Sequence, residues 1–252
     1  MNYRHITFAA ALICTSMTAA PPASAGEPRA VIELFTSQGC SSCPAADKLA
    51  GELAHDPSLL VMSLAVDIWD YLGWKDTLAL HGHTIRQRAY ADARGDREVY
   101  TPQVVVNGIV HVLGSDRVAI EKAIAQTRST AAPLTLAVTM TVADGKVTVN
   151  VPAATDDHRS GEVWLCPITG KTPVAIGRGE NNGRTLTYTN VVRRWVKLGD
   201  WNGNAATYSV PVADLPDADY SLIDVDQLAV IVQSGVVAKP GLMLGAATAS
   251  LR

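Results

Sequence analysis

Two cysteines separated by two residues are the part of this sequence best suited to chemistry. The stretch Cys40-Ser41-Ser42-Cys43 follows an apolar run, Ala30–Thr36, and precedes a segment with helical spacing of its apolar residues, Ala45–Ala54. At the start of a helix, free amides and the positive end of the dipole favour thiolate over thiol, and thiolate is the nucleophile in disulfide exchange. We therefore expect Cys40 to attack a disulfide and Cys43, one turn later, to resolve the mixed disulfide.

Three other interpretations of the cysteine pair stay open. The pair could form a structural disulfide, although so short a loop restricts the unfolded chain little and stabilises the fold little. It could bind copper or zinc together with one histidine, His83 or His111, although no second ligand pair stands at a spacing typical of zinc sites. It could also only close a turn in a non-catalytic binding module. We expect no metal site and no cofactor.

The first 25 residues have the pattern of a cleavable secretory signal. Arg4 stands before an apolar stretch, Ile6–Ile13, and the segment ends in Ala23-Ser24-Ala25, the small-residue pattern that signal peptidase cuts. Pro21-Pro22 argues against a first helix of the fold. We therefore expect cleavage after Ala25 and a periplasmic or secreted protein, in an oxidising compartment where thiols pair.

Composition and charge exclude several classes of protein. The 252 residues are 18% charged and 48% hydrophobic, which is typical of globular domains and excludes wholesale disorder. A formal net charge of −3 argues against a nucleic-acid partner, because such proteins neutralise phosphates with an excess of Lys and Arg. No apolar run reaches the roughly 18 residues that span a bilayer, so we expect no integral membrane segment. We expect the chain to act as a monomer.

Residues 26–130 alternate strand and helix patterns, as expected for an α/β domain. The continuous apolar run Ala30–Thr36 indicates a strand buried on both faces. Asn107-Gly108 predicts a tight turn between two short strands. The other predicted elements are the strand Leu59–Val66, the helix Asp76–Ala93, the strands Gln103–Asn107 and Val110–Leu113, and the helix Ser115–Arg128 with Ser115 as its N-cap. The predicted order is β-α-β-α-β-β-α.

Residues 131–252 lose the helical periodicity after a linker of small residues, 129–133. Asp144-Gly145 between two alternating runs predicts a β-hairpin, and the many short strands favour an all-β, sandwich-like second domain. We expect a scaffold or partner-docking role for this domain, with Cys166 as a small buried apolar residue. The predicted strands are Leu134–Val142, Lys146–Val151, Gly161–Ile168, Thr185–Val196, Ala206–Val212, Leu228–Gln233 and a last one near Leu242–Ser250.

Three sequence blocks resemble glutaredoxins. The blocks are Glu33-Leu34-Phe35-Thr36 with Gly39-Cys40-x-x-Cys43, then Thr101–Gly108, then Gly114-Ser115-Asp116. The resemblance implies a thioredoxin-like fold, a cis peptide bond before Pro102, and substrate binding by backbone groups of Thr101. Ser115 and Asp116, at a helix start, could receive the charged end of a peptide or of glutathione, or only cap the helix.

The sequence also departs from glutaredoxins. Ser41-Ser42 stands between the cysteines in place of Pro-Tyr, so glutathione is only one of the candidate substrates. Three stretches, Phe35–Cys40, Asp67–Trp74 and Tyr100–Gln103, more closely resemble a family of exported bacterial proteins that is labelled only as a domain of unknown function, number twelve twenty-three. That resemblance extends over nearly the whole mature chain and implies a fold and a compartment but no substrate.

The segment Asp67–Trp74 should lie close to the cysteines, because the carboxyl ends of parallel strands open at the same edge of a sheet. Trp69 and Trp74 could grip an apolar substrate there or form a lid that packs a helix onto the sheet. Asp67 could accept a proton from Cys43 or only cap a helix. Taken together, these patterns predict an exported thiol–disulfide oxidoreductase that acts on protein or peptide disulfides.

Overall fold

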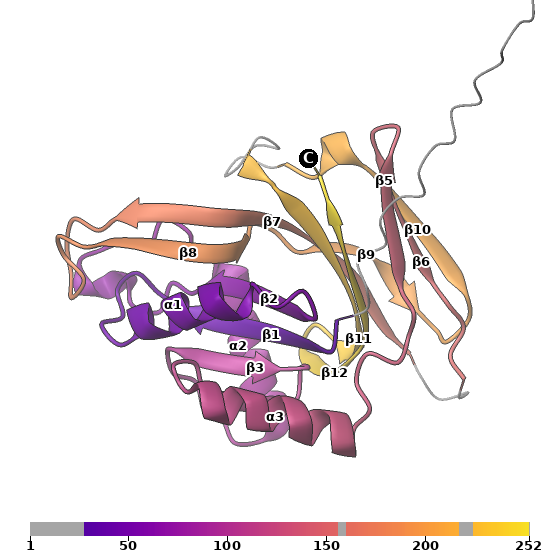
Figure 1. The fold of residues 1–252 in the computed structure, drawn as a ribbon, viewed down its shortest axis with the longest axis horizontal. Helices are drawn as coiled ribbons and strands as arrows, with labels where there is room; N and C mark the ends of the chain where they lie inside the picture. The colour runs from indigo at the N-terminus through magenta and orange to yellow at the C-terminus, as the bar shows by residue number, and fades with distance from the viewer. Residues whose placement is uncertain (1–27, 156–159, 217–223, 252) are drawn as a thin grey trace, which may run out of the picture.

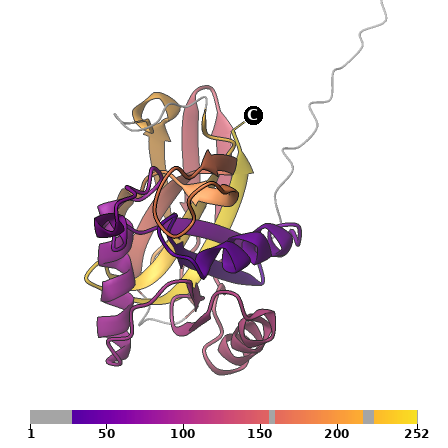
Figure 2. The same ribbon diagram turned by 90° about the vertical axis from the view of Figure 1, so that its left-hand side faces the viewer.

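A curved mixed β-sheet runs through the molecule, and helices pack against it (Figures 1 and 2). The computed structural model describes residues 28–155, 160–216 and 224–251. The predicted secretory signal, residues 1–25, lies outside the described residues, so cleavage after Ala25 stays a prediction. None of the helices in the described ranges is long and apolar enough to cross a membrane.

The first half of the chain folds in the predicted order β-α-β-α-β-β-α. Its strands lie in the order β2-β1-β3-β4, with β1 parallel to β2 and antiparallel to β3, an arrangement that resembles the predicted thioredoxin-like fold. The elements are β1 (Ala30–Thr36), α1 (Cys43–Leu53), β2 (Leu59–Ala65), a 3-10 turn (Asp70–Leu72), α2 (His81–Arg94), β3 (Gln103–Val106), β4 (Val110–Leu113) and α3 (Arg117–Thr130).

Both faces of β1 and β2 are covered, which explains their nearly uninterrupted apolar sequence. Every residue of the two strands is buried. On one face the strands pack against α1 and α3, through Leu49 and Ile120, and on the other face they pack against α2 through Tyr90. A strand covered on both sides has no face left for water, so polar residues do not alternate along it.

The strands of the second half extend the same sheet. Five of them belong to it: β7 (Gly161–Ala175), β8 (Thr185–Val192), β9 (Val196–Trp201), β11 (Gln227–Val236) and β12 (Lys239–Ser250). β8 pairs with β2 at Val191 and Ser63, and the full order is β12-β11-β7-β8-β2-β1-β3-β4, with β9 paired to β7. The expectation of a separate all-β, sandwich-like domain is therefore corrected, because periodicity along a strand does not reveal its partner. The division into one domain of residues 26–130 and another of residues 131–252 stays a prediction.

A second, smaller antiparallel sheet consists of β10 (Ala206–Pro211), β6 (Lys146–Val151) and β5 (Thr139–Ala143), which are not hydrogen-bonded to the main sheet as strand partners. Its strands pack through Val147 and Val149 against Val163 and Trp201 of the main sheet. A 3-10 turn, Val212–Asp214, follows β10.

A buried ion pair joins the two halves of the chain. Arg86 of α2 donates to Glu33 of β1 at 2.7 Å and to the side chain of Gln233 in β11 at 2.8 Å. The hydroxyl of Tyr90 donates to the other oxygen of Glu33. Burial opposes the charge on Arg86, but the carboxylate of Glu33 beside it raises the pKa of Arg86 above its usual value. Each charge therefore depends on the other.

Replacing one member of this pair should destabilise the protein strongly. Arg86→Met leaves Glu33 without its counter-charge, and removing one partner of a buried ion pair costs about 3–5 kcal/mol. The double variant Arg86→Met/Glu33→Leu should lose less than the sum of the single losses, since neither charge is then buried alone. Denaturant unfolding of the four proteins gives the coupling energy, and strictly additive losses would contradict the interaction.

Candidate functional site

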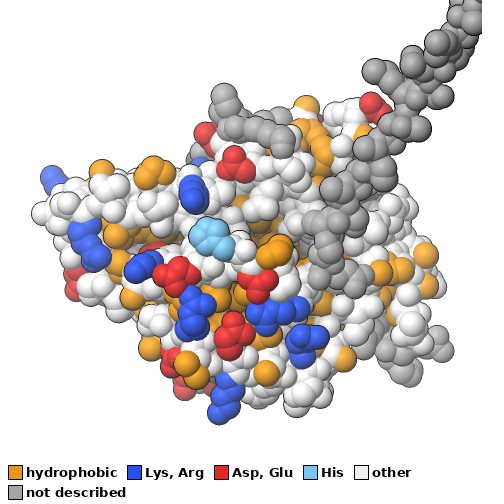
Figure 3. Space-filling view, viewed as in Figure 1, with side chains coloured by type: hydrophobic (Ala, Val, Ile, Leu, Met, Phe, Trp, Pro, Cys, Tyr) orange, Lys and Arg blue, Asp and Glu red, His pale blue; other side chains and the backbone are white. Residues whose placement is uncertain are grey.

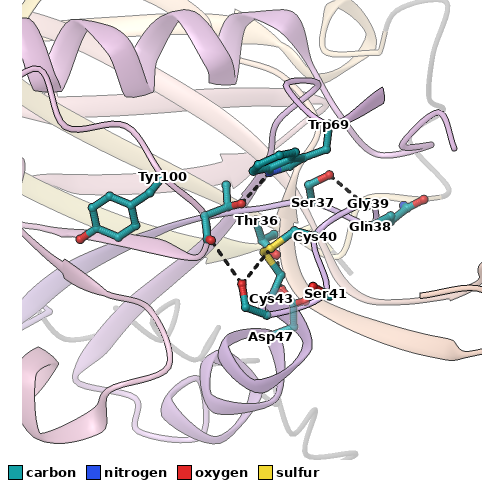
Figure 4. Close-up of a disulfide and its surroundings, with 12 residues drawn as sticks. Thr36, Ser37, Gln38, Gly39, Cys40, Ser41, Cys43, Asp47, Trp69 and Tyr100 are labelled. Atoms are coloured by element: carbon teal, nitrogen blue, oxygen red, sulfur yellow. Dashed lines mark hydrogen bonds between the residues drawn. A yellow bond between two sulfur atoms is a disulfide. The ribbon is translucent and has the colours of Figure 1, made fainter. Parts of the chain in front are cut away.

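Cys40 and Cys43 form a disulfide in the turn between β1 and α1 (Figure 4). α1 begins at Cys43, with Ser42 as its N-cap and Pro44 in its first turn, a position where proline is tolerated because no N–H is needed. Cys40 therefore lies in the turn that precedes the helix. Cys40 is 5% exposed and Cys43 is fully buried. Any partner molecule thus meets the Cys40 side of the disulfide first.

The loop that precedes β3 lies beside the disulfide. The Thr101–Pro102 peptide bond is cis, as the resemblance implies. The hydroxyl of Ser42 lies 3.4 Å from Cys40 Sγ and donates to the carbonyl oxygen of Thr101 at 3.4 Å. The structure therefore brings Thr101 and Pro102 to the cysteine turn, while their role in binding a substrate stays a prediction.

Trp69 and Trp74 form hydrogen bonds with different segments at the cysteine turn. Trp69, which lies near Gly39 and Cys40 in Figure 4, donates through Nε1 to Thr101 Oγ1 at 2.7 Å. A side chain at Gly39 would lie 3.0 Å from the Cβ of Trp69. Trp74 donates to the side chain of Gln38 at 2.8 Å. Both indoles are half-buried with their N–H groups satisfied. These contacts place both rings beside the cysteine turn, and the lid and substrate binding by either ring both stay predictions.

Asp67 is engaged at the start of α2. Its carboxylate accepts from Thr84 Oγ1 at 2.5 Å and bonds His81 Nδ1 at 2.8 Å. Burial works to raise the pKa of Asp67, but the hydrogen bonds from Thr84 and His81 outweigh burial and hold that pKa below its usual value. The predicted proton transfer between Asp67 and Cys43 gains no support from these contacts.

Ser115 and Asp116 are exposed at the start of α3. Asp116, rather than the predicted Ser115, is the N-cap, because its carboxylate accepts from the N–H of Ala119 at 2.9 Å. Gly114, just before them, donates its N–H to the carbonyl of Pro102 at 2.9 Å. The start of α3 therefore lies near the cis-proline loop, and its role in receiving a charged group stays a prediction.

Asp47 is a buried acid near the disulfide that the sequence analysis missed. It stands one turn after Cys43 on α1, on the same face, and is 4% exposed. One oxygen accepts from Thr36 Oγ1 at 2.7 Å, while the other has no hydrogen-bond partner among the described residues. Burial raises the pKa of Asp47 to about 7, with a smaller opposing effect from Thr36. Asp47 can therefore gain or lose a proton near neutral pH.

A groove of about 440 Å³ between α1 and the β7–β8 hairpin reaches Asp47. Its other lining residues include Pro44, Gly51 and Thr187. Basic and acidic side chains alternate over the face of the molecule that carries α1 (Figure 3). The groove gives Asp47 a route for proton exchange with solvent. An acid four residues after the second cysteine, on an otherwise apolar helix face, is the sequence signal that could have identified it.

The loop between β7 and β8 contributes a second set of contacts that the sequence did not reveal. Asn181 is fully buried and donates to the carbonyl oxygens of Gln38 and Cys40, both at 2.9 Å. Glu180 accepts from the N–H of Ser41 at 3.1 Å. The second half of the chain therefore contacts the cysteine turn directly, which goes beyond the predicted scaffold role.

The histidines considered for a metal site have other partners. His83 is buried against the carbonyl of Ala65, and burial lowers the pKa of His83 to about 4. His111 contacts Tyr100 and Gln103, both at 3.1 Å. Within the part of the chain that the structure describes, no group of three or more His, Cys, Asp and Glu side chains could hold a metal ion. Cys166 is free and buried.

The fold and the site together define a mixed α/β protein with an oxidised C-x-x-C pair at the strand–helix turn of a fold that resembles thioredoxin. The chain belongs to the family described as protein of unknown function DUF1223, which matches residues 31–233. This membership confirms the resemblance found in the sequence. None of the curated proteins matches the chain.

Two solved structures are similar to the chain. Protein AGR_C_4864 from Agrobacterium tumefaciens is 29% identical, with a TM-score of 0.76, and the match covers 88% of this chain and 94% of that one. HBP35 of Porphyromonas gingivalis is 13% identical, with a TM-score of 0.56, and the match covers 89% of this chain and 76% of that one. At that identity the second similarity shows the fold alone.

Asp47 should make stability fall as the pH rises. Because its pKa in the folded protein, about 7, lies above the ordinary 3.8, the stability linked to its proton is complete below pH 4 and lost as the pH rises through 7. Asp47→Asn keeps an acceptor for Thr36 but cannot ionise. The variant should match the wild type near pH 4 and exceed it at pH 8, by at most on the order of 4 kcal/mol. Denaturant unfolding across this range tests the effect, and a difference that does not vary with pH would contradict it.

Proposed function

We propose that this protein is an exported thiol–disulfide oxidoreductase that acts on protein or peptide disulfides. The single observation that carries the proposal is the oxidised Cys40–Cys43 pair at the strand–helix turn, with the Thr101–Pro102 loop linked to it through Ser42. A buried acid on the same helix face as Cys43 supports it. The compartment rests on the sequence pattern of residues 1–25, and glutathione and a monomeric state remain part of the proposal.

The proposed reaction is a pair of thiol–disulfide exchanges. In the reduced protein, the thiolate of Cys40 attacks a sulfur of the substrate disulfide, which forms a mixed disulfide and releases one substrate thiolate. The thiolate of Cys43 then attacks Cys40 Sγ, which releases the second substrate thiolate and leaves the Cys40–Cys43 disulfide. Two electrons pass from the protein to the substrate, and an external thiol returns the protein to the dithiol. The same steps in reverse oxidise a substrate dithiol.

Asp47 is suited to take the proton that the second exchange requires. Cys43 is fully buried, so its thiol cannot lose its proton directly to solvent. The carboxylate of Asp47 lies on the same face of α1 and has a pKa of about 7, near that of a base poised for neutral pH. The groove beside α1 returns the proton to water. Asp47→Asn should therefore slow release of the mixed disulfide more than it slows its formation.

Trapping experiments test the roles of the two cysteines. With Cys43→Ala, a peptide disulfide should form a stable adduct on Cys40, because no thiol remains to resolve it. Cys40→Ala is the matched control and should form few adducts, since Cys43 is fully buried. Peptide mapping by mass spectrometry locates the adducts and separates them from any on Cys166. Equal labelling of Cys43 in the control would contradict the assigned roles.

Turnover separates an enzyme from a binding module. The wild type, reduced by a chemical thiol, should reduce protein or peptide disulfides faster than the same concentration of a free dithiol does. A rate equal to that of the free dithiol would leave Cys40–Cys43 as a structural link and favour the binding-module alternative.

A further inference from the structure

The β7–β8 loop places one charged side chain directly on the cysteine turn. Glu180 Oε2 accepts a hydrogen bond from the backbone N–H of Ser41, between the two cysteines, at 3.1 Å. The two residues are 139 positions apart in the sequence, so this contact depends on the fold. The turn therefore receives a carboxylate from the half of the chain that lacks the cysteine motif.

The position of Glu180 is fixed by its buried neighbour. Asn181 is fully buried and donates to the carbonyls of Gln38 and Cys40, while its own side-chain oxygen accepts from Arg184 at 2.8 Å. Trp74 packs against the same loop, since a side chain at Gly179 would lie 3.4 Å from its Cβ. The backbone at Glu180 is therefore held beside the turn by its neighbours, and its exposed side chain reaches the Ser41 amide from there.

A carboxylate at this position affects the two redox states differently. The amides that precede α1 would favour a thiolate on Cys40, but the exposed carboxylate of Glu180 accepts from one of them and adds a negative charge at the residue that follows Cys40. A disulfide carries no charge and is indifferent to that carboxylate. Destabilising the thiolate therefore favours the disulfide and makes the dithiol a stronger electron donor.

We propose that Glu180 is a positioning residue that acts through the Ser41 amide and biases the Cys40–Cys43 pair toward the oxidised form. This inference rests on the proposed function for its meaning, because it implies that the pair donates electrons to substrate disulfides. Glutathione is the redox couple against which this bias is measured. Two glutathione thiols reduce the protein disulfide to two thiols and become glutathione disulfide, with transfer of two electrons and two protons.

Glu180→Gln tests the charge while keeping the acceptor for Ser41. The equilibrium with glutathione should shift toward the protein dithiol by about two- to fivefold, the size typical of a charge near a helix end. This shift corresponds to a potential higher by about 10–20 mV, because a tenfold change is about 30 mV for two electrons. Cys40 should also react faster with iodoacetamide. Alkylation followed by mass spectrometry gives both quantities, and the melting temperature should stay unchanged.

Salt and a matched variant separate the charge effect from a structural one. Between 0.1 M and 1 M salt the screening length falls from about 10 Å to about 3 Å, so the difference between Glu180→Gln and the wild type should shrink. Asp144→Asn, in the β5–β6 hairpin turn, removes a carboxylate from the separate small sheet and should leave the equilibrium unchanged. The other charges near the turn, Asp47, Asp76 and Arg184, are present in all three proteins.

Two outcomes would overturn the inference. The first is an equilibrium constant for Glu180→Gln that equals that of the wild type at low salt. The second is a shift of the same size in Asp144→Asn. Neither measurement depends on turnover of a substrate, so a protein that fails to reduce any protein or peptide disulfide would contradict the proposed function without affecting this test.

Discussion

The contact between β8 and β2 is the constraint on which the rest of the structure depends. Without β8, the order β2-β1-β3-β4 would leave β2 as an edge strand. All residues of β2 are buried, and the backbone N–H and C=O groups on its outer side need hydrogen-bond partners. Ser63 of β2 donates to the carbonyl of Thr189 at 2.6 Å, and Asn190 donates to the carbonyl of Val61 at 3.0 Å. With β8 in this position, the loop that joins it to β7 lies on the cysteine turn. Side chains of the second half thereby contact the cysteine turn of the first half.

One shared core follows from the same contact. Phe35 and Met62 of the first half pack in one cluster with Ile231 and Met243 of the second. The Glu33–Arg86 pair completes this core with a polar contact to β11. A buried charge pair is weak evidence for added stability but it fixes which groups must face each other. The molecule therefore depends on both halves of the chain for the shape of its sheet and for the surroundings of its disulfide.

Local patterns predicted the elements well, but they did not reveal that the strands of the second half join the sheet of the first. The bounds of β1, β4 and β6 agree with the sequence, because β1 is buried throughout, β6 alternates between buried and more exposed residues, and the Asn107-Gly108 turn indicates where β4 begins. α2 begins five residues later than predicted. The carboxylate of Asp76 accepts from the N–H groups of Gln38 and Leu78, and so holds that segment against the cysteine turn instead of opening a helix. The predicted strand Thr185–Val196 is interrupted, and β9 follows as a separate strand.

The residues of the candidate site likewise fall into those that the sequence could identify and those that only the fold reveals. Cys40, Thr101 and Pro102 could be identified because their motif is local or resembles a known family. Asp47 carries only a weak signal, since an acid on a helix is usually solvated, and its raised pKa arises from burial that only the fold reveals. Asn181 carries no signal at all, because its partners are carbonyl oxygens of residues 38 and 40, more than 140 positions away.

The two sides of the cysteine turn differ in the number of buried contacts that hold them. This difference affects how a substrate would reach Cys40. On one side, the buried groups of Asn181 and Asp76 fix the backbone from Gln38 to Cys40. On the other side, Trp69 is joined to Thr101 by one hydrogen bond, and the 3-10 turn that follows it buries none of its residues. Segments with few buried contacts open at lower free energy than segments with many. For the proposed exchange, access to Cys40 from the Trp69 side would disturb fewer buried contacts than access from the Asn181 side, and it would leave Glu180 and Asn181 in place.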